Sequence, residues 1–199
     1  GGSLPVTLKE VTSSTQSASI GYNALEKSVI AGAIGFALIF ILMIAAYRFL
    51  GLIANVALLL YIILVLWAMA FSGSTLTLPG IAGIILGIGM AVDANVIIFS
   101  RIREEMSAGK SVRISCESGF HNALSAIMDG QITTLIAGVV LYEVGSATVK
   151  GFAVTLMLGV IFSIISGVLI TRLYLETFIG LKREEPKKSL FGVKEDGSA

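Results

Sequence analysis

The chain has 199 residues, a formal net charge of +1, a hydrophobic fraction of 55 % and a mean hydropathy of +0.92. Its apolar residues come in long blocks, which predicts an all-α polytopic membrane protein and leaves no room for a large soluble domain beside the spans. The charge balance gives no electrostatic argument for a nucleic-acid partner, and none is expected. The single cysteine, Cys116, excludes an internal disulfide.

The first segment, residues 1–27, is polar. Leu4, Val6 and Leu8 alternate with polar residues and Pro5, which predicts a short strand, and the Ser/Thr-rich stretch 12–19 is typical of a linker. A short strand is not stable alone. We therefore interpret this segment as the end of a domain whose remainder is missing.

Five apolar blocks predict a transmembrane domain over residues 28–181. The longest connection is predicted to be a cytoplasmic loop over 101–121, where Ser111 is a candidate cap for a short amphipathic helix. Residues 182–199 are polar and are interpreted as a cytoplasmic tail. The predicted spans are approximately 28–47, 50–71, 79–100, 122–142 and 149–173.

The distribution of Lys and Arg predicts the orientation in the membrane. With the C-terminus inside, eleven basic residues are cytoplasmic and only Lys9, Lys27 and Lys150 lie outside. We therefore expect the N-terminus outside and the C-terminus in the cytoplasm. A chain that begins outside without a visible signal peptide indicates that an upstream span is missing.

Small residues recur at a spacing of four in two of the spans. Gly83 and Gly87 form a GxxxG pair in the third span, and Gly159, Ser163 and Gly167 repeat the spacing in the fifth. Because lipid provides no hydrophobic drive between helices, such positions favour close backbone packing. The alternative is that glycine is simply frequent in membrane helices.

Asp93 lies inside the third span, eight positions before Arg101 and about 12 Å from the cytoplasmic end at 1.5 Å per residue. An aspartate inside a membrane-spanning segment costs roughly 2.5–3.5 kcal/mol on the insertion scale, so it usually has a partner or a function. Burial disfavours the charged form of a carboxylate. Asp93 is therefore the candidate proton carrier. Asn95 projects about 200° away, and the alternative is that both residues only bond neighbouring helices.

The fourth span carries a second group of polar residues. Asp129 follows His121 by eight positions, and Asn122, Ser125, Asp129 and Thr133 share one helical face, whereas Gln131 and Thr134 point elsewhere. Such a stripe should face protein or water. The candidate polar network consists of Asn95, Asp129, Gln131, Thr133 and Thr134. Asp129 can alternatively bond a backbone amide or a serine.

Signals for enzymatic chemistry are missing from the sequence. It contains no nucleophile–base arrangement, phosphate-binding loop or Cys/His spacing typical of metal sites. We therefore expect no enzyme activity, no cofactor and no metal.

Several segments resemble the SecD members of the SecD/SecF family, which belongs to the RND-like transporters. The resemblance covers about residues 4–181, and its most specific part is GMAVDANVIIFSRIREE. It implies a half-transporter bundle that lacks its first span and most of a periplasmic domain. The matching segments are LPGIAGIILGIGMAVDANVIIFSRIREE from Leu78, GKSVR from Gly109, ITTLIAGVVL from Ile132 and KGFAVTLMLGVIFSIISGVLITRL from Lys150.

The resemblance also implies a function. SecD acts with SecF in the bacterial cytoplasmic membrane and uses the proton motive force to assist preprotein export through SecYEG. The implied partners are SecF, the SecYEG translocon, accessory translocase subunits, the preprotein and membrane lipid. Asp93 matches the membrane aspartate that carries the proton, whose cationic counterpart lies in SecF.

The chain departs from the family pattern in one place. The family usually reads DANITT in the fourth span, where this chain has Gly130 and Gln131, so the resemblance gives no role to Gln131.

Two other functions stay open: a module that only docks SecF and the translocon, and half of an RND-type small-molecule exporter. The DAN sequence at 93–95 disfavours the exporter.

Overall fold

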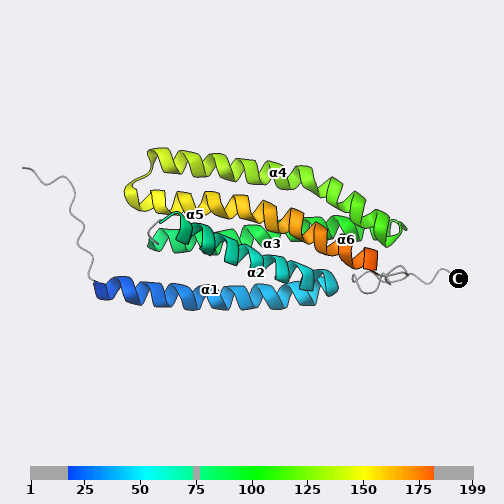
Figure 1. The fold of residues 1–199 in the computed structure, drawn as a ribbon, viewed down its shortest axis with the longest axis horizontal. Coiled ribbons are helices and arrows are strands. Elements are labelled where there is room, and N and C mark those ends of the chain that lie inside the picture. Colours follow the sequence, from blue (N-terminus) through cyan, green and yellow to red (C-terminus); the bar gives the residue numbers. More distant parts are fainter. Residues whose placement is uncertain (1–17, 74–76, 182–199) are drawn as a thin grey trace, which may run out of the picture.

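Five long helices form the part of the chain that the computed structural model describes, residues 18–73 and 77–181 (Figure 1). No strand occurs in these ranges, so the predicted all-α, five-span fold is confirmed. The strand expected near Leu4 and the tail 182–199 lie outside the described residues. The elements are α1 (Ala18–Tyr47), α2 (Phe49–Phe71), α3 (Leu78–Ser107), α4 (Val112–Val144), α5 (Ala147–Ile164), the π-helical η1 (Ile165–Ile170) and α6 (Thr171–Leu181).

The helices are longer than the predicted spans. Helix α1 begins at Ala18, and α3 continues to Ser107. Most of the connection predicted over 101–121 is helical, because only residues 108–111 separate α3 from α4. Charged residues end a membrane crossing without ending a helix, and here the break comes at Gly109, whose φ is +91°.

The beginning of α4 is amphipathic, as the sequence indicated. Val112, Cys116 and Phe120 are buried against the end of α3, where they join the larger hydrophobic cluster. Ser111 occupies the N-cap position, but its side chain makes no capping hydrogen bond. The helix start is thus fixed mainly by apolar packing of one face.

Helix α3 lies at the centre of the bundle. It contacts α5 and α4 most extensively and also touches α2 and α1. Figure 1 shows α1 and α4 along opposite edges, with α2, α3 and α5 between them. Accordingly α1 and α4 bury the smallest share of their apolar residues within the chain. The middle of the bundle also encloses Tyr61, which is fully buried.

The glycines of α3 lie where this helix meets α5. A methyl group at Gly83 would lie 3.2 Å from the Phe152 carbonyl oxygen, and one at Gly87 would lie 3.6 Å from Gly159 Cα and collide with the Tyr61 hydroxyl. The missing side chains therefore allow the two backbones to approach closely.

The fifth span continues this contact beyond Gly159. Ser163 is fully buried, and its hydroxyl donates to the Val160 carbonyl at 2.8 Å. A methyl group at Gly167 would lie 3.2 Å from Ala94 Cβ, so the spacing of small residues follows the face of the span that meets α3.

Candidate functional site

The two polar residues of α3 lie on opposite sides of the helix. Asp93 is exposed, whereas Asn95 is buried with only 1 % of its surface accessible. Because successive residues turn about 100° around a helix, two positions separate the side chains by about 200°. The structure therefore divides α3 into an inner face, which packs in the bundle, and an outer face, which carries Asp93.

On the inner face, Asn95 bonds to the last helix of the chain. The Thr171 hydroxyl donates to Asn95 Oδ1 at 2.8 Å, and Asn95 Nδ2 donates to the Ala91 carbonyl at 3.3 Å. Thr171 is fully buried, and its hydroxyl also lies 3.3 Å from the Ser166 carbonyl. These contacts satisfy the amide of Asn95 inside the chain and tie α3 to the start of α6.

The hydrogen bond from Thr171 follows directly after the π-helical segment η1. Single π turns inside α-helices are frequent at functional sites. Gly167 of η1 packs against Ala94, the residue between Asp93 and Asn95. The section of α3 that carries Asp93 is thus held from behind by a glycine contact and a buried hydrogen bond.

On the outer face, Asp93 continues a stripe formed with Ala82, Leu86 and Gly89. All four residues are exposed, and a methyl group at Gly89 would meet no atom within 4 Å. Among the described residues, no cation forms an ion pair with Asp93. The described part of the chain therefore leaves the carboxylate accessible on its surface and without a compensating cation.

The polar stripe of α4 is also on the surface. Asn122, Ser125, Asp129 and Thr133 are all exposed, as the helical spacing indicated. Thr133 donates to the Asp129 carbonyl at 2.8 Å, a bond within one turn of the same helix. The hydroxyl of this stripe thus bonds locally and leaves the Asp129 carboxylate free of hydrogen bonds from described residues.

The structure does not bring the five residues of the candidate network together. In the described ranges no hydrogen bond joins Asn95 to α4, because Asn95 bonds to Thr171 instead. Thr134 donates to the Gly130 carbonyl at 2.9 Å, and Gln131 is buried with its Oε1 unbonded. The inner amide and the polar stripe of α4 are therefore separate features.

Two structural features near the site were not predicted from the sequence. One is Thr171, a small polar residue near the end of an apolar span, whose partner depends on how α5 and η1 pack against α3. The other is Gly119, where a methyl group would lie 2.8 Å from the Ile102 backbone nitrogen. Ser115, Gly119 and Ala123 repeat the spacing of four and are all buried, so the pattern was present in the sequence, across the predicted loop and the start of the predicted fourth span.

The geometry does not indicate a metal or a catalytic centre. Within residues 18–73 and 77–181, no three His, Cys, Asp or Glu side chains gather in a way that could hold a metal ion. Asp93 is an exposed carboxylate in the middle of α3, at a section that Gly167 and Thr171 hold from the opposite face, and Asp129 is a second exposed carboxylate in the middle of α4. Such a group can bind a proton or pair with a cation supplied from outside the chain.

Comparison with known families identifies the family of this chain. Residues 5–179 match the family described as protein export membrane protein SecD/SecF, C-terminal. The chain belongs to the SecD/SecF family. The SecD subunit of the protein translocase from Dictyoglomus turgidum is 44 % identical over 192 residues, which cover 96 % of this chain and 48 % of that protein. The SecDF subunit of Bacillus subtilis is 45 % identical over 192 residues, 96 % of this chain and 26 % of the relative.

A solved member of the SecD/SecF family has the same fold. The crystal structure of SecDF, a translocon-associated membrane protein from Thermus thermophilus, superposes with a TM-score of 0.80 at 39 % identity. The match covers 85 % of this chain and 24 % of the larger one. The chain thus spans less than half the length of these SecD and SecDF relatives and corresponds to a membrane part of them.

Proposed function

We propose that this chain is the membrane part of a SecD-type subunit that, together with SecF, uses the proton motive force to assist preprotein export through SecYEG. Asp93 is the proton carrier in this proposal. The relatives are named protein translocase subunits, which supports a role in protein translocation. The observation that carries the finer proposal is the position of Asp93, mid-helix, exposed and without a cationic partner among the described residues.

An exposed aspartate at this depth requires a covering partner, because a carboxylate facing lipid is unfavourable. The outer face of α3 is apolar around Asp93, and its small residues, Ala82 and Gly89, allow a second helix to approach. A SecF half would cover this face and supply the missing cation across a pseudo-symmetric interface, the usual place of coupling sites in repeat-built transporters.

The proton cycle follows from this arrangement. When the cation of the partner lies beside Asp93, the charged carboxylate is favoured, and when it moves away, the carboxylate binds a proton. A membrane potential contributes about 2.3 kcal/mol per charge per 100 mV. Alternation between the two states converts proton passage into movement of the two halves.

The proposal includes a location and an orientation. The chain lies in the bacterial cytoplasmic membrane with its N-terminus outside and its C-terminus in the cytoplasm, as the excess of basic residues around the α3–α4 turn supports. SecF, SecYEG, accessory translocase subunits and the exported preprotein are the proposed partners. The part outside the membrane that would hold a preprotein is not among the described residues.

Replacement of Asp93 by Asn within a complete SecD subunit tests the function. We expect normal assembly with SecF and loss of the export that depends on the proton gradient, measured as preprotein uptake into energised membrane vesicles. Glu104→Gln is the matched control, because Glu104 is an exposed acid of the same helix beyond the predicted span. Normal gradient-dependent export by the Asp93→Asn protein would rule out the proton role.

A second candidate function, a docking module without proton transfer, is favoured by the open apolar face around Asp93. The glycines at 83 and 87 do not test it, because they pack inside the chain against α5 and Tyr61. Gly89 does, since its surroundings are empty. If the chain only docks SecF, Gly89→Leu should abolish co-purification with SecF while Asp93→Asn leaves export intact.

A further inference from the structure

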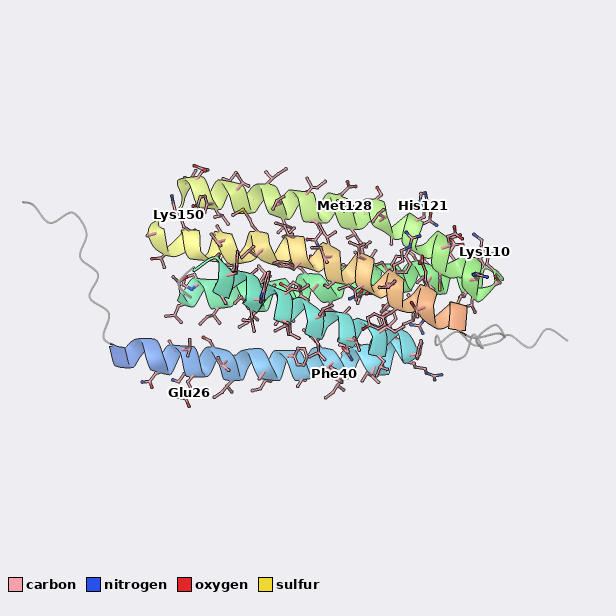
Figure 2. The ribbon with its side chains drawn as sticks, viewed as in Figure 1. Glu26, Phe40, Lys110, His121, Met128 and Lys150 are labelled. Atoms are coloured by element: carbon pink, nitrogen blue, oxygen red, sulfur yellow. The ribbon has the colours of Figure 1, made fainter. Side chains whose placement is uncertain are left out.

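A cavity of about 850 Å³ opens at the end of the bundle that carries the α3–α4 turn. One wall is the first half of α4, and the other is the end of η1 with the beginning of α6. In Figure 2 the labelled Lys110 and His121, two of the lining residues, lie near this end of α4. The cavity lies at the other end of the bundle from the labelled Lys150.

The polarity of the cavity changes along its length. Among the lining residues, Arg113 and Glu117 belong to the start of α4 and Glu176 to α6, whereas Leu124 comes further along α4 and Val168 lies in η1, before α6. Since α4 and α6 run in opposite directions (Figure 1), the charged residues of both walls fall toward the outer end of the cavity and the apolar residues toward its inner end. Arg113 and Leu124 are eleven residues apart, about 16 Å along the helix. The cavity is thus charged at one end and apolar at the other.

This gradient coincides with the predicted membrane boundary. Leu124 and Val168 fall within the predicted spans 122–142 and 149–173, whereas Arg113 precedes the fourth span by nine residues. The apolar end therefore lies at the depth of acyl chains and the charged end at the depth of head groups. A soluble anion would use only the outer end.

Two of the charged side chains at the outer end have no ion-pair partner among the described residues. Arg172 Nε bonds to Glu176 Oε1 at 2.7 Å, and Lys110 pairs with Glu105. Across the described part of the chain, Arg113 and Glu117 form no ion pair with each other or with another side chain. A free guanidinium and a free carboxylate, one helical turn apart, thus face the same cavity.

We propose that this cavity binds one phospholipid whose head group carries both a phosphate and a primary ammonium, as phosphatidylethanolamine does. The Arg113 guanidinium holds the phosphate, since its planar fork of donors matches phosphate oxygens. The Glu117 carboxylate accepts hydrogen bonds from the ammonium. One acyl chain lies along the apolar wall formed by Phe120, Leu124 and Val168. Charged pockets between helices near the cytoplasmic surface are known sites for lipid head groups.

Binding of defined lipids to the delipidated chain in detergent, followed by native mass spectrometry, tests the proposal. We expect the unaltered chain to retain phosphatidylethanolamine more tightly than phosphatidylglycerol, which has no ammonium. Arg113→Gln should weaken phosphatidylethanolamine binding about tenfold, the loss of one charge-assisted contact. Glu117→Gln should remove the preference over phosphatidylglycerol. Both residues are exposed, so neither change affects the core.

Arg101→Gln is the matched control, because Arg101 is exposed near the same end of the bundle but does not line the cavity. It should leave lipid binding unchanged. Equal binding by the Arg113→Gln and unaltered chains would overturn the proposal. So would equally tight binding of glycerophosphoethanolamine, which has the head group without acyl chains, because the site would then bind a soluble phosphate compound.

Discussion

The inner and outer faces of α3 differ in packing, burial and hydrogen bonding although they belong to one helix. On the inner face, Gly83 and Gly87 lie in contact with α5 and Tyr61, and Asn95 is hydrogen-bonded and buried. On the outer face, Gly89 has free space around it and Asp93 has no partner among the described residues. On the inner face, glycines and a polar residue therefore pack inside the bundle. On the outer face, a glycine and a polar residue remain accessible to a partner.

This difference shows how a membrane helix can carry a carboxylate that is unfavourable in lipid. The inner contacts fix the position and rotation of α3, so that the outer carboxylate is presented at a defined depth without help from its own neighbours. Small residues on the outer face leave room for another helix. Stability and the proposed function should then respond to different substitutions, even at adjacent positions.

The largest expected effect on stability comes from replacing Gly87 by Leu, and the same replacement at Gly89 is the comparison. Gly87→Leu should destabilise the chain by about 3 kcal/mol or more, because the new side chain overlaps the buried Tyr61 hydroxyl and the α5 backbone. Gly89→Leu should change stability by less than about 0.5 kcal/mol. Reversible unfolding in mixed detergent, followed by circular dichroism, measures both. Similar losses for the two variants would contradict the division into two faces.

A smaller effect is expected from Thr171→Val, which keeps the shape of the side chain and removes its hydroxyl. Asn95 Oδ1 would lose its donor in a buried position, at a cost of about 1–2 kcal/mol. Thr171→Ser keeps the donor and is the control. If Thr171→Val costs nothing in unfolding experiments while Thr171→Ser is destabilising, the hydrogen bond contributes nothing and the methyl packing of Thr171 decides.

The smallest expected effect on stability belongs to the residue with the largest proposed function. Asp93→Asn should alter the free energy of unfolding of the isolated chain by less than about 0.5 kcal/mol, since no contact of the carboxylate is lost. The same unfolding measurement checks this. A large destabilisation would show that Asp93 has a structural partner within the chain.

The sequence predicted the five spans and the opposite faces of Asp93 and Asn95, because hydropathy and the helical repeat depend on local order alone. It did not predict where helices end, since Arg101 and Arg103 mark the edge of the apolar block while the helix continues to Ser107. The partner of Asn95 was not predictable either. Thr171 is 76 residues away, and only the packing of α5 and η1 against α3 brings the two together.

The π-helical turn in η1 sets the direction of the side chains that follow it, including Thr171, which bonds to Asn95 of α3. A π turn accommodates one more residue than an α turn, and every residue after it is rotated accordingly. If Ile165–Ile170 were wound as an ordinary α-helix with no residue removed, all later side chains would swing by about 100°. The Thr171 hydroxyl would then leave Asn95, and Arg172 and Glu176 would leave the wall of the cavity. The π turn thus positions both the buried Thr171–Asn95 hydrogen bond and the α6 wall of the cavity.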